Sequence, residues 1–307
     1  MKKVIALALC LVSLLWFGQT PIQSSGSKNV LIIGWDGAGK VEVKQLLNEG
    51  NLPNLENLVS EGTITSIDIL RFTDTKAGWS QILTGYNPEK TKVYNNNKFT
   101  AIPAGWTILE RLEKDSVYTA FIAGKGANVG ALKQPTNGKL QPYYYTKGNI
   151  DFYQNELGAN EKVASIALEK IESNVAQQLM MFIHFEEPDK QYHQYKGVGT
   201  QYMDAIKDDD YWLGVIIDKL KELDIYDNTL VYVVSDHSVN YIDDIWVKAQ
   251  HQDAPYSFLA TNDDSIIRRG DRIDIAPTIY ETLGIDWESY TPALDGYPLQ
   301  QDYKVKW

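Results

Sequence analysis

Short, almost continuous apolar runs recur along the chain, and amphipathic stretches separate them. Such runs are typical of strands buried on both faces of a parallel sheet, whereas the helices that cover the sheet repeat their apolar residues every three to four positions. The alternation has no linker-like break, which predicts one doubly wound α/β domain over residues 27–307, with a mostly parallel central sheet and helices on both faces. Strands are predicted at 29–35, 63–70, 117–123, 180–185 and 228–234, and helices at 41–47, 54–61, 106–112, 161–171 and 202–223.

The N-terminal segment follows a different pattern. Two lysines are followed by an uncharged apolar run, Val4–Phe17, of 14 residues. This is typical of a secretory signal and short for a membrane span, so residues 1–26 are predicted to be a signal peptide with a short linker, and the protein to be secreted or periplasmic. An uncleaved anchor is the alternative, because the segment has no clear small-x-small cleavage site. Cys10 is the single cysteine and lies in this run, so any metal site in the mature protein must use oxygen and nitrogen ligands.

The charge excludes some partners. The chain has a formal net charge of −11, and loss of Lys2 and Lys3 with the signal would leave 27 basic against 40 acidic residues, or −13. This balance argues against nucleic acid or an anionic membrane as a partner. A solvated acidic surface explains most of the excess of acidic residues, and carboxylates gathered around cations are a second contribution.

Polar groups follow four of the predicted strands at their carboxyl ends. Asp36 follows the first strand, Lys125 lies in a glycine-rich loop after the third, and Asp236 and His237 follow the fifth. The carboxyl ends of parallel strands meet at the edge where ligands bind, so these groups are expected to lie close together. The fourth strand is followed by Asp189 and His193, a spacing that lets both side chains face one cation.

A hydroxyl is predicted at a turn between a strand and a helix, in the stretch Phe72–Gly85. Thr75 there would face the unbonded N–H groups of the helix start, where an anionic group could sit during transfer. Taken alone, the stretch favours an ordinary helix N-cap. A threonine nucleophile also needs a base or a metal to activate it, which the rest of the chain must supply.

Several motifs, in this order, resemble the alkaline phosphatase superfamily, nearest to its type I phosphodiesterase/nucleotide pyrophosphatase branch and to the related sulfatases. The resemblance spans about residues 29–286. It is carried by Trp35-Asp36-Gly37, Leu52-Pro53-Asn54-Leu55, Thr75 nine residues before Thr84-Gly85, Pro188-Asp189-x-x-x-His193, Ser235-Asp236-His237, His251 and Asp274-Ile275-Ala276-Pro277-Thr278.

The resemblance implies an alkaline phosphatase-like fold and two divalent metal ions, with Zn favoured and Mn or Fe as alternatives. One ion would be held by Asp36, Asp236, His237 and the Thr75 oxygen, and the other by Asp189, His193 and His251. The resemblance also implies that Thr75 attacks phosphorus in a small-molecule phosphate ester or nucleotide, and that water then clears the phospho-enzyme.

Two departures bear on the substrate. The segment after Thr75 lacks the residues that sulfatases use to make formylglycine, which excludes that chemistry. Gly78 stands where nucleotide pyrophosphatases of this branch place an asparagine that holds a phosphate oxygen. The Gly78 backbone N–H, Lys76 or Lys125 is expected to take over that role. A phosphodiesterase or nucleotide pyrophosphatase is therefore predicted; the alternatives are a phosphomonoesterase, a phosphotransferase and a non-catalytic metal-binding envelope protein.

Two further expectations concern the region around the site. Residues 95–150 have little clear periodicity in their second half and are predicted to form an excursion over the active face or a substrate lid. His184 lies within a predicted strand, so it is expected to be a core residue or to support a metal ligand.

Overall fold

A computed structural model of the 307-residue chain describes residues 28–69, 72–113, 116–134, 137–239 and 256–302. The predicted signal peptide and His251 lie outside the described residues. Within the described part, no helix is both long and apolar enough to cross a membrane.

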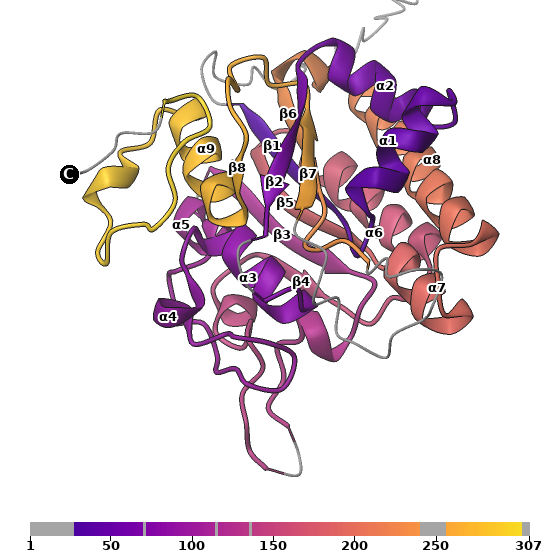
Figure 1. Cartoon of the computed structure of the whole chain (residues 1–307). Helices are drawn as coiled ribbons and strands as arrows, with labels where there is room; N and C mark the ends of the chain where they lie inside the picture. The colour runs from indigo at the N-terminus through magenta and orange to yellow at the C-terminus, as the bar shows by residue number, and fades with distance from the viewer. Residues whose placement is uncertain (1–27, 70–71, 114–115, 135–136, 240–255, 303–307) are drawn as a thin grey trace, which may run out of the picture.

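One sheet of eight strands runs through the centre of the molecule (Figure 1). Its order is β4-β3-β5-β1-β6-β7-β2-β8, and the first five strands of that order are parallel to one another. The predicted mostly parallel sheet is thus confirmed. The strands are β1 (Asn29–Trp35), β2 (Thr63–Asp68), β3 (Val117–Ala123), β4 (Phe152–Gln154), β5 (Gln178–Phe185), β6 (Thr229–Val234), β7 (Tyr256–Thr261) and β8 (Gly270–Asp271).

Helices cover both faces of the sheet (Figure 1). Alternate residues of β1 divide between two apolar cores, because successive side chains of a strand point to opposite faces. One core lies under α1 (Lys40–Asn48), α2 (Pro53–Ser60), α6 (Asn160–Ser173), α7 (Glu187–Tyr195) and α8 (Thr200–Glu222). The other lies under α3 (Thr75–Thr84), α5 (Ile108–Leu112) and α9 (Ile275–Thr282), and the short α4 (Pro88–Thr91) follows α3.

The second half of the sheet departs from the parallel pattern. β7 runs antiparallel to both β6 and β2, so β2 points in the same direction as β6 but is separated from the parallel strands by β7. Within the predicted excursion at 95–150, α5 packs in the core and β3 lies inside the sheet between β4 and β5, as the helix predicted at 106–112 and the strand predicted at 117–123 require. The part that projects from the body is the hairpin around the bridge between Lys133 and Leu140 (Figure 1).

The parallel order places the functional groups. Four consecutive strands of the sheet, β3, β5, β1 and β6, are parallel, so their carboxyl ends meet at one edge. The segments after these four strands carry Asp36, Lys125, Asp189 and Asp236 with His237. Their predicted meeting at this edge is confirmed by the distances between them.

Candidate active site

Asp36 follows β1 and is fully buried. Its Oδ2 accepts hydrogen bonds from Trp79 Nε1 at 3.1 Å and from His184 Nε2 at 2.8 Å. These two donors fix the carboxylate, so Oδ1 faces the middle of the site. Burial by itself raises the pKa of Asp36, but the charge of Lys125 and the hydrogen bond from His184 outweigh it and lower the pKa to about 2. His184 therefore holds a site carboxylate in place, as expected for a supporting residue.

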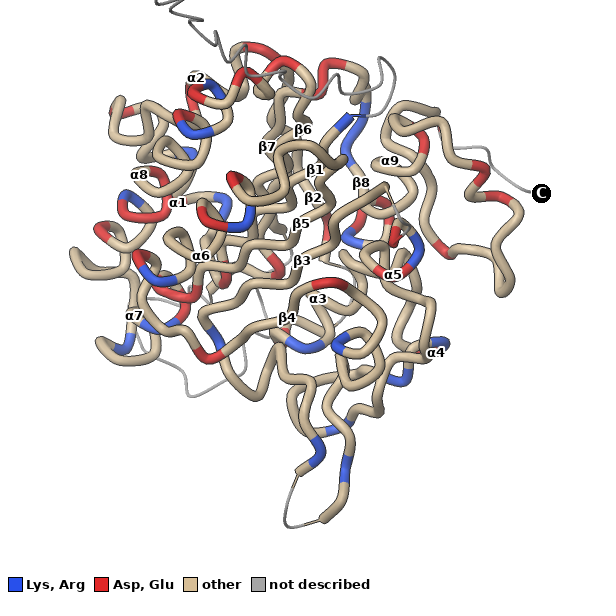
Figure 2. The backbone as a smooth tube through the Cα atoms, turned by 180° about the vertical axis from the view of Figure 1, so that it is seen from behind, with Lys and Arg blue, Asp and Glu red and all other residues tan. Residues whose placement is uncertain are grey.

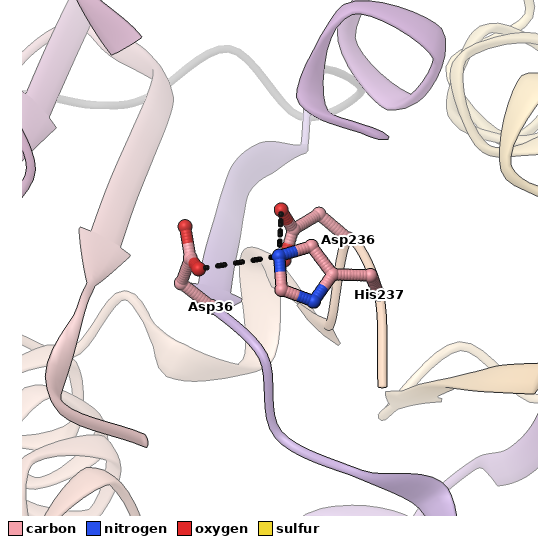
Figure 3. A group of neighbouring side chains, drawn as sticks. All are labelled: Asp36, Asp236 and His237. Carbon is pink, nitrogen blue, oxygen red and sulfur yellow. Dashed lines mark ion pairs between the residues drawn. The ribbon is translucent and has the colours of Figure 1, made fainter. Parts of the chain in front are cut away.

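Asp236 and His237 follow β6, and both are fully buried. His237 Nδ1 lies 3.1 Å from the Ser238 carbonyl oxygen, which can only accept, so Nδ1 carries the proton and Nε2 presents a lone pair. Nε2 lies 3.7 Å from Asp36 Oδ1 and 3.4 Å from Asp236 Oδ2 (Figure 3). Three ligand atoms of the types that bind divalent cations thus converge within 4.8 Å of one another.

The electrostatics of this cluster fit a divalent cation. Asp236 Oδ2 is buried and accepts no hydrogen bond from the part of the chain that the structure describes. Burial, followed by the nearby Asp36 charge, raises the pKa of Asp236 well above its usual range. Asp36, Asp189 and Asp236 share one ammonium group, that of Lys125, so their negative charge exceeds the positive charge among them. A cation bound between Asp36, Asp236 and His237 would supply the missing charge.

Thr75 is the first residue of α3, and its side chain reaches this cluster. The hydroxyl Oγ1 lies 3.3 Å from His237 Nε2 and 3.2 Å from Lys125 Nζ. Asp74, not Thr75, occupies the N-cap position, and the N–H group of Lys76 in the first turn donates to Asn96 Oδ1 at 3.1 Å. The ordinary capping role considered for Thr75 is therefore wrong, and its hydroxyl is directed to the site.

Lys125 lies after β3, with its amino group at the centre of the site. Nζ donates to Asp36 Oδ1 at 2.5 Å and to Asp189 Oδ2 at 2.6 Å, in addition to Thr75. Burial disfavours the ammonium form, but the charges of Asp189 and Asp36 outweigh burial and raise the pKa of Lys125. The ammonium is therefore fixed and permanently charged beside the threonine hydroxyl.

Asp189 and His193 lie one turn apart on α7, with Asp189 Oδ1 3.3 Å from His193 Nε2. The segment after β1 packs directly on this helix start. A Cβ on Gly37 would lie 2.7 Å from the Asp189 Cβ, and Gly37 has a φ of +69°, so both the close approach and the backbone conformation require glycine. The structure therefore brings together Asp189 and His193, the two described residues of the second predicted metal site.

Two of the predicted oxygen-holding groups face elsewhere. Lys76 Nζ donates to the Ala127 carbonyl at 2.7 Å and to Asn128 Oδ1 at 3.1 Å, away from the three site carboxylates. The Gly78 N–H donates to the Asp74 carbonyl at 2.9 Å within the helix, so the expectation that it holds a substrate oxygen is wrong. A Cβ on Gly78 would lie 2.7 Å from the Asp236 Cβ, which explains why no side chain stands there.

Arg272 supports the site, although no local pattern in the sequence predicts this role. It is fully buried, and its guanidinium donates to the Asp236 carbonyl at 2.7 Å and to the Phe72 carbonyl at 2.8 Å. Burial lowers its pKa to about 10. Arg272 thus ties the segment before Thr75 to the segment that carries Asp236.

Known structures share this fold. A protein of the alkaline phosphatase superfamily from Vibrio parahaemolyticus is 22% identical, with a TM-score of 0.60 over 91% of this chain and 71% of that one. Alkaline phosphatase from the Antarctic bacterium TAB5 is 15% identical, with a TM-score of 0.59 over 85% and 99% of the two chains, and a variant of it holds Mg. The lipoteichoic acid synthase LtaP from Listeria monocytogenes is 17% identical, with a TM-score of 0.55 over 90% and 76%.

Sequence comparison identifies the family more directly. A search of curated protein sequences finds no match. The family model for type I phosphodiesterase / nucleotide pyrophosphatase matches residues 30–291, which include every described site residue. The chain therefore belongs to the type I phosphodiesterase/nucleotide pyrophosphatase family.

Proposed function

We propose that this protein is an exported, metal-dependent phosphodiesterase in which Thr75 is the nucleophile. The observation that carries the proposal is the position of the Thr75 hydroxyl, which lies 3.2 Å from the Lys125 ammonium and 3.3 Å from the lone-pair nitrogen of His237. A threonine hydroxyl in this position ionises more easily than one in water, because the adjacent positive charge stabilises the alkoxide.

The residues around Thr75 have separate roles in this proposal. Thr75 Oγ1 forms a bond to phosphorus as the bond to the leaving oxygen breaks, and water later hydrolyses the phosphothreonine. Lys125 donates to Oγ1 and stabilises negative charge on it. A divalent cation held by Asp36, Asp236 and His237 would lower the pKa of the attacking hydroxyl. Asp189 and His193 would hold a second cation, with His251 as the third predicted ligand.

The charge of the site favours diesters over monoesters. A phosphate monoester brings one more negative charge than a diester and needs further cationic donors at the reacting phosphorus. Lys125 is already paired with Asp36 and Asp189, so it has little excess charge to offer. Lys76, the other lysine considered for this role, is directed to Ala127 and Asn128.

Replacement of Thr75 tests the proposal. Thr75→Ala in the full chain, supplied with divalent cations, should lose at least about 10⁴-fold in turnover of bis(p-nitrophenyl) phosphate, as expected for loss of a covalent nucleophile. Ser80→Ala is the matched control, because it removes another buried hydroxyl from the same helix and should keep near-normal turnover. Circular dichroism would show that both variants fold. Wild-type turnover by Thr75→Ala would exclude the proposed mechanism.

A further inference from the structure

The ring of Phe99 brings two ammonium groups together. Lys76 Nζ lies 4.7 Å from the ring centroid and Lys139 Nζ lies 3.5 Å from it. Both distances are those of cation–π contacts. Phe99 is only 6% exposed, so its ring is held in the core while it presents a face to each cation.

Neither ammonium group donates a hydrogen bond to a carboxylate of the described residues, and the attraction of Asp74 for the Lys76 ammonium is weaker than the repulsion from Lys139 or from Lys125. Lys76 Nζ donates to the Ala127 carbonyl and to Asn128 Oδ1, and Lys139 Nζ donates to the Asn97 carbonyl at 2.8 Å. All three acceptors are uncharged amide or carbonyl oxygens. Lys76 is buried and Lys139 is half-buried, and an ammonium group removed from water without a counter-ion is costly, so this pair favours the binding of an anion.

The surrounding segment is basic, although the whole chain has a net charge of −11. Exposed Lys98 and Lys133 lie near Lys139, on the loops that project below α3, where Figure 2 shows blue positions with few red ones. The red positions gather instead around α2, α7 and α8 (Figure 2). The loops below α3 thus form a basic side of an otherwise acidic molecule.

This basic side is continuous with the proposed active site. Lys76 directly follows Thr75, and its two acceptors lie in the short helix η1 (Ala127–Val129), two residues after Lys125. Lys139 and Lys125 both repel the Lys76 ammonium. A substrate whose reacting phosphorus lies at Thr75 could therefore extend toward Lys139.

We propose that Lys139 and Lys76, held by Phe99, form a subsite for a second anionic group of the substrate, such as a further phosphate. Lys76 has one N–H and Lys139 two beyond those already bonded. The subsite would select phosphodiesters that carry another anion on the group that remains attached to the enzyme-bound phosphorus. This inference rests on the proposed function, since that function places the reacting phosphorus.

A pair of substrates tests the subsite. Ethyl p-nitrophenyl phosphate and its analogue with a terminal phosphonate on the ethyl group share the reacting phosphorus and the leaving group. The full chain should have a lower KM for the phosphonate. Lys139→Gln keeps a donor for Asn97 but removes the charge, and it should raise that KM by about tenfold while leaving the neutral ester within about twofold. Lys139→Arg should restore the preference.

The control is Lys133→Gln, which removes an equal charge from the exposed part of the same hairpin and should change neither KM. If Lys133→Gln and Lys139→Gln raised the KM for the phosphonate equally, general electrostatic attraction would explain the preference, and the proposal would be overturned. So would a wild-type protein that does not discriminate between the two esters.

Failure of the subsite can be separated from failure of the proposed function. If neither ester is hydrolysed, calorimetry with inorganic pyrophosphate tests the subsite alone. Binding to the full chain should weaken by about tenfold in Lys139→Gln and not in Lys133→Gln. Unchanged pyrophosphate binding in Lys139→Gln would overturn the subsite, whichever reaction the protein catalyses.

Discussion

Lys125 and Lys76 place the same side chain in opposite environments on either side of the start of α3. The Lys125 ammonium lies between Asp36 and Asp189, and their charges raise its pKa. The Lys76 ammonium lies between neutral acceptors and an aromatic ring, and burial with two neighbouring ammonium groups lowers its pKa to about 8. The first lysine is therefore a fixed part of the acidic site, whereas the second is repelled by Lys139 and Lys125 and is only weakly attracted by Asp74.

Loss of Lys125 should destabilise the fold much more than loss of Lys76. In the presence of chelator, Lys125→Met should destabilise the fold by about 3–5 kcal/mol, because it leaves Asp36 and Asp189 buried without their cation. Urea unfolding would measure this. Lys76→Met should change the free energy of unfolding at neutral pH by less than about 1 kcal/mol, because it removes a buried charge together with two hydrogen bonds.

Divalent cations supply the internal control for that measurement. A cation that binds the same carboxylates should restore much of the stability of Lys125→Met, and the restored stability should rise with cation concentration. If Lys125→Met were as stable as the wild type in chelator, the assigned ion pairs would contribute nothing.

Replacement of Lys125 should also lower kcat much more than replacement of Lys76. Lys125→Met should lower kcat for bis(p-nitrophenyl) phosphate by about 10²–10³-fold at saturating cation, because Lys125 donates to the attacking oxygen. Lys76→Met should keep kcat within about tenfold, since its ammonium is directed away from the three carboxylates. Equal losses of kcat would contradict the separation of their roles.

The sequence was sufficient for the residues whose positions follow from strand ends. Asp36, Asp236 and His237 come directly after buried parallel strands, so their meeting could be predicted from topology. Lys76 was less predictable, because nearness to Thr75 in sequence suggested nearness in space. Consecutive helical residues point about 100° apart, and Lys76 is therefore directed to Ala127.

Packing between distant segments could not be predicted. Gly78 was interpreted as a missing amide, yet the contact that excludes a side chain there comes from Asp236, far away in sequence. Arg272 bonds two carbonyl groups that meet only in the folded chain, those of Asp236 and Phe72. Neither contact leaves a local pattern of polar and apolar residues, which is the only signal that periodicity provides.

The smallest expected effect is the pH dependence of stability that comes from Lys76. Its pKa of about 8 in the folded protein lies below the ordinary value of 10.5. Between these values the unfolded chain binds more protons, so the free energy of unfolding of the wild type should rise with pH across this window, by at most about 3 kcal/mol. Lys76→Met should lack this rise, and the difference between the two proteins, measured by urea unfolding in chelator, removes the contribution of other titrating groups. A rise of equal size in both proteins would show that the Lys76 ammonium is balanced after all, and the contrast with Lys125 would then be lost.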